Sequence, residues 1–467
     1  MASLFATCKT SILKGILTNL LVDDTNGRIV QDALAILSFP FADGVSSMPL
    51  ISGHIEKWVA QGFNNPFQQS DQATIHSLHS LLSRLILFIE DYLAKATDPF
   101  PSRAYMAVPG LVSPGPRFKG KRIDIKPVKF ITLNRAEKIR FLRAFLRYEL
   151  LCKIYHPRVW PSIDISCADQ VKFMHEKLPP VEKKELYCVD EYFKGVYGAI
   201  FAHCQDSWLP DRPASFSSDG VSKHGLLYPD TVHFSARDYF TDMDIQGRNL
   251  ASILPCFGLD LLVHILASLD KQEDYGRYLK RWFRTLSSKF TWSYNPWISN
   301  SHFAKRNGQS ATFDPDVYHR GLRQDSPHRR FMPMPIFQHY SRYEPWDRDE
   351  QKERILDMHE LQLGIYRQRA WVFFDDVRLF PDVRSHFPTM ESLDKQDQIA
   401  NNRLGPSYER ARRRSKKWQD YYWGRSLDNP LYVREEDEEE EEVTVEDNEG
   451  HLTRFFEEPV IGKIPSF

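Results

Sequence analysis

Apolar residues recur every three or four positions along most of this chain, a spacing that places them on one face of an α-helix. The clearest case is residues 71–96, which prolines at 99 and 101 prevent from continuing. Its apolar face consists of Ile75, Leu78, Leu82, Leu85, Ile89 and Leu93. The same spacing predicts further helices at residues 1–21, 28–37, 51–61, 134–156, 181–204, 247–254, 259–269, 275–286 and 347–379. No alternation at period two is long enough to require a sheet, so we expect an all-α protein built as a large irregular helical bundle with long loops.

The helix at 134–156 is apolar on nearly every side, which predicts that it is buried. It nevertheless carries Arg140, Arg143 and Arg147 in one stripe at helical spacing, with Glu149 nearby. A buried unpaired charge costs several kcal/mol, so each arginine needs a partner. We interpret these four residues as a polar hub that determines which helices pack together. The alternative is an anion-binding pocket lined by the arginines.

Three acidic pairs lie in apolar segments that could reach this stripe. They are Glu90 with Asp91, Asp190 with Glu191, and Asp375 with Asp376.

Net charge, cysteine content and overall hydropathy exclude few classes of function. The 467 residues carry a formal net charge of −1, so no overall field favours nucleic acid or an anionic membrane. The six cysteines are scattered without a CxxC pair, which indicates reduced thiols in an intracellular protein and predicts no zinc site. The most apolar window, 250–269, is interrupted by Pro255, Asp260 and His264, so we expect a buried helix there and no membrane contact.

The prediction for domain organisation is a helical body over residues 1–385, with a possible break into two lobes near 109–128, where prolines and glycines gather. Residues 287–345 are rich in aromatics and prolines and show no clear period. The extension at 386–467 is first basic and then acidic, with eight consecutive acids from Glu435 to Glu442, and we expect it to be largely disordered.

Catalytic motifs are incomplete. The chain has no GxGxxG, GxxxxGK[ST] or GxSxG, so we expect no cofactor. An HExxH that begins at His359 fails because position 363 is Leu, and no metal site is predicted.

Asp260 and His264 have the spacing of an acid and base pair, although a core histidine is the commoner explanation. Asp242 and Asp244 form a short DxD that fits a turn better than a nucleotide-sugar site. Histidines at 302, 319, 328 and 339 match no ligand spacing.

The most specific local signal is a basic run followed by aromatics. Its cationic residues are Arg410, Arg412, Arg413, Arg414, Lys416 and Lys417. Such a run fits a nuclear import sequence, and the neighbouring Trp418, Tyr421 and Tyr422 could stack on single-stranded nucleic acid. A solvated helix explains the same residues, and we regard nucleic acid as an unlikely partner.

Two segments carry a resemblance to a known family. LNRAEKIRFLRAFLRYELLCKIYH, beginning at Leu133, and RAWVFFDDVRL, beginning at Arg369, resemble segments of a large family of uncharacterised filamentous-fungal helical proteins. FIEDYLAKAT, beginning at Phe88, is similar to that family too. The resemblance covers residues 28–380 in patches and implies a helical fold without an assigned activity. Some relatives carry an N-terminal F-box, whose Leu-Pro start and hydrophobic pattern are not evident here.

These observations favour a non-catalytic intracellular interaction or adaptor protein with protein partners, located in the cytoplasm or the nucleus. One alternative is an enzyme of unrecognised type with an arginine-lined or histidine and carboxylate pocket. The other is a nuclear protein that associates with nucleic acid through residues 410–417.

Overall fold

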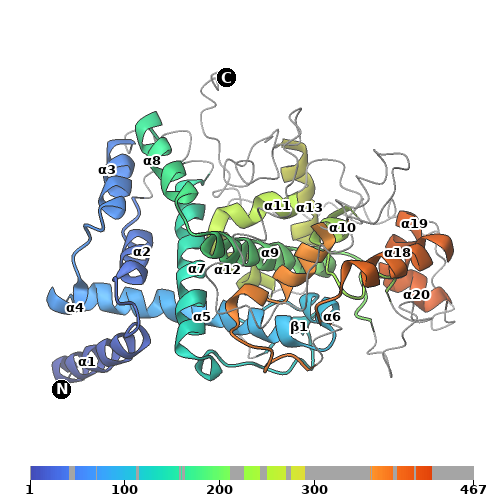
Figure 1. Ribbon diagram of the computed structural model, residues 1–467, viewed down its shortest axis with the longest axis horizontal. Helices are drawn as coiled ribbons and strands as arrows, with labels where there is room; N and C mark the ends of the chain where they lie inside the picture. Colours follow the sequence, from blue (N-terminus) through green and yellow to red (C-terminus); the bar gives the residue numbers. More distant parts are fainter. Residues whose placement is uncertain are drawn as a thin grey trace.

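The computed structural model describes residues 2–40, 48–69, 71–111, 115–156, 159, 163–210, 226–241, 250–269, 275–289, 358, 360–381, 386–403 and 406–422. Within these residues the regular elements are helices, apart from one short antiparallel hairpin. This confirms the predicted all-α class. Figure 1 shows a central group of crossing helices, with α1 to α4 and α8 at one end and α18 to α20 at the other.

The first half contains α1 (Ala2–Leu20), α2 (Arg28–Leu37), α3 (Met48–Val59), α4 (Pro66–Gln69), α5 (Gln72–Thr97), α6 (Pro101–Tyr105), the hairpin of β1 (Arg117–Phe118) and β2 (Lys121–Arg122), and the 3-10 helix η2 (Phe130–Thr132). The central part contains α7 (Arg135–Ile154), α8 (Ile165–Glu176), α9 (Pro180–His203) and α10 (Ala236–Thr241). Then follow α11 (Leu250–Ile253), η4 (Leu254–Phe257), α12 (Gly258–Leu269), α13 (Tyr275–Lys289), helical residues 360–368, η8 (Trp371–Phe373), α18 (Met390–Arg403), α19 (Pro406–Arg414) and α20 (Lys416–Tyr422).

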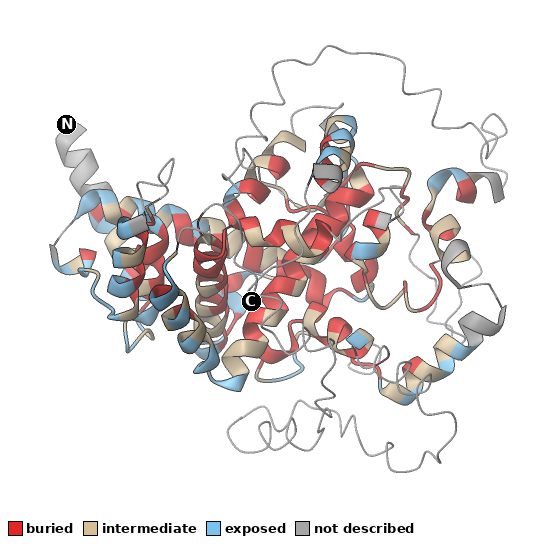
Figure 2. Cartoon of the chain, turned by 90° about the horizontal axis from the view of Figure 1, so that it is seen from above, coloured by how far each residue is buried: buried red, intermediate tan, exposed pale blue. Residues whose placement is uncertain are grey.

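The core forms where α5, α7 and α9 meet (Figure 1). Tyr92 of α5 stacks on Tyr192 of α9 with ring centroids 4.7 Å apart, and Phe141 of α7 stacks on Phe373 of η8 at 4.0 Å. All four rings are buried, and burial of each aromatic side chain contributes about 1.5–3 kcal/mol. Figure 2 shows buried residues filling the centre of the molecule, whereas the helices at its two ends carry more exposed positions.

α7 begins with a capping box. The side chain of Asn134 accepts a hydrogen bond from the backbone N–H of Glu137, and the Glu137 carboxylate accepts one from the backbone N–H of Asn134. This reciprocal pair satisfies two backbone donors that a helix start would otherwise leave open. The predicted helix at 134–156 is therefore correct to within two residues at its C-terminal end.

Residues 109–128, where a possible break into two lobes is predicted, connect helices that pack against each other. Phe118, Ile123 and Ile125 are buried, and α5 and α7 on either side of the segment pack directly through Tyr92 and Phe141, whose centroids lie 6.2 Å apart. These contacts give no support to the possible break, which stays a prediction. Prolines and glycines mark a turn, but only the contacts of the flanking helices decide whether a domain ends at it.

The expected helix at 347–379 ends at residue 368. Ala370 adopts a left-handed conformation with φ 53°, which the regular helix cannot continue through. Farther on, Asp376 Oδ1 accepts a hydrogen bond from the backbone N–H of Arg378, a local turn that competes with a helix. Asp375 and Asp376 therefore lie in an irregular loop.

Three helices beyond the boundary predicted at residue 385, α18, α19 and α20, pack on the body. Leu393 and Trp418 are buried, and a β-bridge joins Ser415 to Ser207. The Trp208 Nε1 donates a hydrogen bond to the carbonyl of Arg413. Residues 423–467, which include the acidic block, and residues 290–357 lie outside the described part of the chain.

Among the described residues, one helical stretch, Leu250–Leu269, is long and apolar enough by composition to cross a membrane, and 61% of its apolar window of 18 residues is buried inside the protein. It is interrupted by η4, and Gly258 has a φ of 72°. These features are those of core helices packed against α7 and α9.

The close approach of α6 to α9 yields a stability prediction. A Cβ on Gly195 would lie 2.6 Å from Cδ1 of Tyr105, whose ring is fully buried and has no room to move. We expect Gly195→Ala to lower the free energy of unfolding by about 1–3 kcal/mol, measured by urea denaturation. Gly15→Ala on α1 is the control, because nothing lies within 4 Å of its added Cβ. That control should be neutral or slightly stabilising, and equal losses in both variants would contradict the packing described for Gly195.

Candidate functional site

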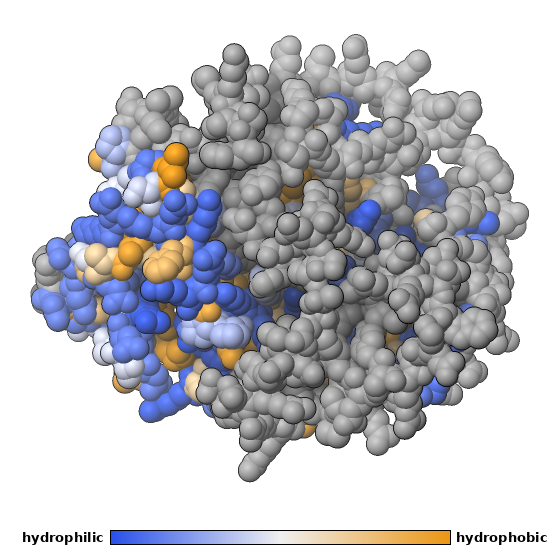
Figure 3. Space-filling model, turned by 45° about the horizontal axis from the view of Figure 1, so that its top comes forward, coloured by the Kyte–Doolittle hydropathy of each residue, from blue (hydrophilic) through white to orange (hydrophobic). Residues whose placement is uncertain are grey.

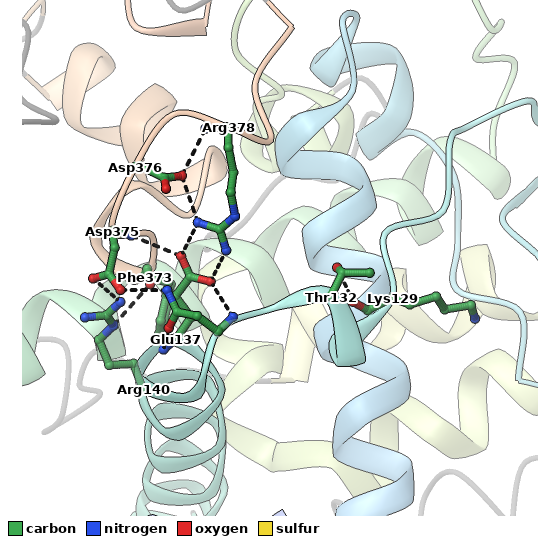
Figure 4. Close-up of polar contacts among 9 residues, drawn as sticks. Lys129, Thr132, Glu137, Arg140, Phe373, Asp375, Asp376 and Arg378 are labelled. Carbon is green, nitrogen blue, oxygen red and sulfur yellow. Dashed lines mark hydrogen bonds and ion pairs between the residues drawn. The ribbon is translucent and has the colours of Figure 1, made fainter.

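The first arginine of the stripe on α7 holds the loop that follows η8. Arg140 Nη2 lies 2.7 Å from Asp375 Oδ1, and Arg140 Nε donates to the carbonyl of Phe373 at 3.1 Å (Figure 4). Beside it, the fully buried Glu137 binds Arg378 from the same loop. Two ion pairs thus fix this loop on the first turns of α7.

The second arginine joins α7 to α9. Arg143 Nη2 donates to both carboxylate oxygens of Glu185, at 2.8 and 2.6 Å, and Nη1 lies 3.3 Å from Glu182 Oε1. Glu185 is buried, so this pair replaces the water that its carboxylate loses on folding.

The third arginine joins α7 to α2 and α3. Arg147 Nε and Nη2 donate to the two carboxylate oxygens of Asp32, at 2.9 and 3.2 Å. Trp58 Nε1 donates to the same carboxylate at 2.7 Å, and the guanidinium carbon of Arg147 lies 5.3 Å from the centre of the Trp58 ring. Asp32, Trp58 and Arg147 therefore form a preorganised unit, which we call the Arg147 triad.

Asp375 is the one member of the predicted acidic pairs that binds a stripe arginine. The others have different partners: Glu90 binds Lys129, Asp91 binds Lys95 and Tyr192, Asp190 binds Lys194 and Tyr148, Glu191 lies near His233 and Gln368, and Asp376 binds Arg378. The predicted pairing was wrong for Arg143 and Arg147. Helical spacing identifies acids on apolar helices, but the rotation of each helix about its axis decides which of them faces α7.

Glu149 points away from the stripe, toward η4 and α12. Its Oε2 accepts a hydrogen bond from the backbone N–H of Leu259 at 2.8 Å, and Lys153 lies 3.6 Å from Oε1. A Cβ on Gly258 would lie only 2.8 Å from this carboxylate, and side chains fill the space beside it. Burial raises the pKa of Glu149. Glu149 is thus a buried carboxylate that stabilises the packing of α7 on α12, and it is not part of an anion site with the arginines.

Next to the Arg147 triad the surface opens into a groove with a volume of about 360 Å³, between α2, α3, α7 and α8. Its polar lining consists of Arg28, Gln31, Asp32, Gln61, Arg147 and Lys177. Its apolar lining consists of Trp58, Val59, Phe173, Met174, Leu178 and Pro179. We call this set the Arg147 groove. The buried Asp32, with Arg147, lies at its floor, whereas Arg28 and Lys177 are exposed and lie at its rim. The groove thus combines polar and apolar side chains, as ligand-binding clefts do.

Exposed apolar side chains lie on the same end of the molecule. Leu50 on α3 and Ile165 and Phe173 on α8 are 62%, 76% and 55% exposed, although α3 and α8 pack against each other. On the left of Figure 3, hydrophobic patches lie among hydrophilic ones on this part of the surface. Sequence reasoning missed the groove because α8 was not predicted. Asp164, which caps α8 through the Cys167 N–H, was a usable signal.

Asp260, which the sequence pairs with His264 as an acid and base, is bound by two cationic side chains of the fold. Asp260 lies 3.1 Å from the Nζ of Lys153 and 3.3 Å from Nη1 of Arg84, and these cations lower its pKa against the opposing effect of burial. Within the described residues no group of three or more His, Cys, Asp or Glu side chains is placed to hold a metal ion. Asp242, Asp244, His359 and the histidines at 302, 319, 328 and 339 lie outside those residues.

The basic run is folded into α19 and α20 and makes contacts within the protein. These contacts join Arg410 to Asp397 and the Tyr228 carbonyl, Arg412 and Arg413 to the Trp418 ring, Arg414 to Asp230, Lys416 to Asp420, and the Lys417 backbone N–H to Asp206. Arg413 and Arg414 are buried. In this fold the run is therefore part of packed helices, with Lys416 and Lys417 exposed, and its role in nuclear import stays a prediction.

Removing one member of the Arg147 triad has a predictable cost. Arg147→Ala leaves the buried Asp32 carboxylate without its cation, and we expect a loss of about 3–5 kcal/mol in the free energy of unfolding. Arg28→Ala, at an exposed position on the groove's edge, should change stability by less than about 0.5 kcal/mol. Chemical denaturation of both variants tests this, and a neutral Arg147→Ala would show that Asp32 does not depend on Arg147.

A second prediction concerns acid stability. Burial raises the pKa of Glu191, but His233, whose Nε2 lies 3.6 Å from Oε1, and the charge of Lys194 outweigh this effect and lower the pKa from 4.5 to about 2. The unfolded chain therefore binds this proton more readily than the native protein does. Stability that is present above pH 4.5 should be lost as the pH falls toward 2, by on the order of 3 kcal/mol. Urea denaturation across this range should show a shallower pH dependence for Glu191→Gln. An unchanged slope would contradict the assignment.

Comparison of the chain with protein-family models, with curated proteins and with solved structures gave no match. The similarity to the fungal helical family therefore stays an expectation from the residue patterns. The Arg147 groove, with a buried ion pair at its floor, is the candidate functional site.

Proposed function

We propose that the protein is a non-catalytic intracellular adaptor that holds a segment of a partner protein in the Arg147 groove. The observation that supports this most directly is the groove itself. Its volume of about 360 Å³ is at the lower end of the range for ligand clefts, a size that suits a few side chains of a partner.

The floor of the groove is suited to recognition because it is fixed before a partner arrives. Asp32 is 1% exposed and accepts hydrogen bonds from Arg147 Nε and Nη2 and from Trp58 Nε1. Both carboxylate oxygens are thus engaged in holding the floor, which leaves Asp32 unsuited to act as a general base. Binding to such a rigid surface loses little conformational entropy.

The walls supply the apolar contacts from which interfaces gain most of their affinity. Trp58 is buried and presents its ring beside Arg147, whereas Phe173 is 55% exposed with its ring 3.9 Å from the Nζ of Lys177. Tryptophan and arginine are the residue types most enriched among strongly contributing interface positions. Phe173 can gain burial when a partner covers it, because more than half of it is now in water.

The test compares groove variants with a matched control. Phe173→Ala and Met174→Ala each truncate an apolar side chain that lines the groove. The control, Ile131→Ala, truncates an apolar side chain that is 79% exposed in η2, outside the groove. Full-length proteins are immobilised, incubated with lysate of the native cells, and the retained proteins are quantified by mass spectrometry. We expect a set of proteins retained by the wild type and by Ile131→Ala to fall at least about tenfold with the groove variants.

Thermal denaturation must show that all variants are folded. If the same proteins are retained at equal levels by every variant, the groove is not the docking site and the proposal is wrong. A retained protein that is lost only with the groove variants is then titrated with purified components to obtain its dissociation constant.

A further inference from the structure

The groove has an excess of positive charge that the fold does not use. Three cationic side chains line it, Arg28, Arg147 and Lys177, against the single carboxylate of Asp32. Asp32 is already engaged by Arg147. Arg28 and Lys177 are exposed and form no ion pair within the described residues.

Arg147 also keeps hydrogen-bond donors for a ligand. A guanidinium has five N–H groups, and Asp32 occupies one on Nε and one on Nη2. Nη1 makes no hydrogen bond within the described residues, and it is not sealed from solvent as a buried unsatisfied atom would be. The Nη1 and Nη2 edge of Arg147 is therefore open toward the groove that the residue lines.

This edge is the geometry that binds a carboxylate through two parallel hydrogen bonds. Arg147 is held in place by Asp32 and Trp58, so a ligand does not have to order its side chain. The side chain is only 13% exposed, and an ion pair there is screened by water less than one on an open surface. Burial, Lys183 and Arg147 lower the pKa of the neighbouring His175, against the opposite effect of Glu176.

Resting on the proposed function above, we infer that the Arg147 groove recognises an acidic peptide segment in which one Asp or Glu is flanked by large apolar side chains. The acidic side chain binds the free edge of Arg147, with Arg28 and Lys177 attracting it from the rim. The flanking apolar side chains pack on Phe173, Met174 and Leu178. Charge complementarity thus selects the partner, and apolar contact supplies the affinity.

The experiment selects peptides from a random nonamer library displayed on phage against the immobilised full chain. Selected sequences are synthesised in pairs, once with the acid and once with the corresponding amide, and titrated by fluorescence anisotropy. We expect Asp or Glu beside Leu, Phe or Trp among the selected peptides. The amide versions should bind at least about tenfold more weakly, and affinity should fall with rising salt.

Three protein variants locate the contact. Arg147→Lys keeps a cation for Asp32 but removes the Nη1 and Nη2 edge, and Lys177→Gln removes a rim charge. Arg135→Gln is the control, because that arginine is on α7 with its side chain 80% exposed and does not line the groove. Arg147→Lys should weaken binding about tenfold, Lys177→Gln about two- to fivefold, and Arg135→Gln not measurably.

The outcomes separate the two proposals. Acid and amide peptides that bind equally, yet compete with Phe173-dependent partners, would overturn the acidic preference and leave the docking function intact. Selected peptides whose binding ignores Arg147→Lys and Phe173→Ala would overturn the groove as the site. Failure to select any peptide, together with unchanged protein retention by the groove variants, would overturn both.

Discussion

The structure depends on one constraint: a helix that is buried on almost every side cannot keep unpaired charges. α7 passes through the core with Arg140, Arg143 and Arg147 on it, and each arginine meets a carboxylate from a different element. An interior charge without a partner would cost several kcal/mol. The pairs therefore help determine which neighbour packs where along α7: the loop after η8, then α9, then α2.

Hydrophobic spacing was enough to predict the helices because their packing follows the apolar stripes. The helix at 28–37 was predicted to the residue, and 134–156 needed only small corrections. Spacing failed where backbone geometry or distant contacts decide the outcome. The left-handed Ala370 ends a helix that the pattern continues, and the helices after residue 385 are held by contacts with Ser207, Trp208 and Asp230 that no local pattern reveals.

The candidate site was predictable only in part. Arg147 was recognised as a residue that would either be paired or line a pocket, and it does both, since one edge of its guanidinium binds Asp32 and the other faces a groove. Nothing in the sequence pattern linked Asp32, Trp58 and Phe173, because they come from three different helices, and α8 is more than a hundred residues from α2 and α3 along the chain. A groove exists only once those helices are packed, so its walls cannot be read from any single segment.

The double use of Arg147 affects how this protein can change over evolutionary time. A substitution at position 147 would disturb both the anchoring of the first helices and the groove that we propose as a docking site, so under this proposal selection acts on it through two properties at once. Arg28 and Lys177 are exposed, and no ion pair of the described core includes them. Mutational drift at these two rim positions can therefore change the charge of the proposed docking site at little cost to the fold, while the floor beneath them stays the same.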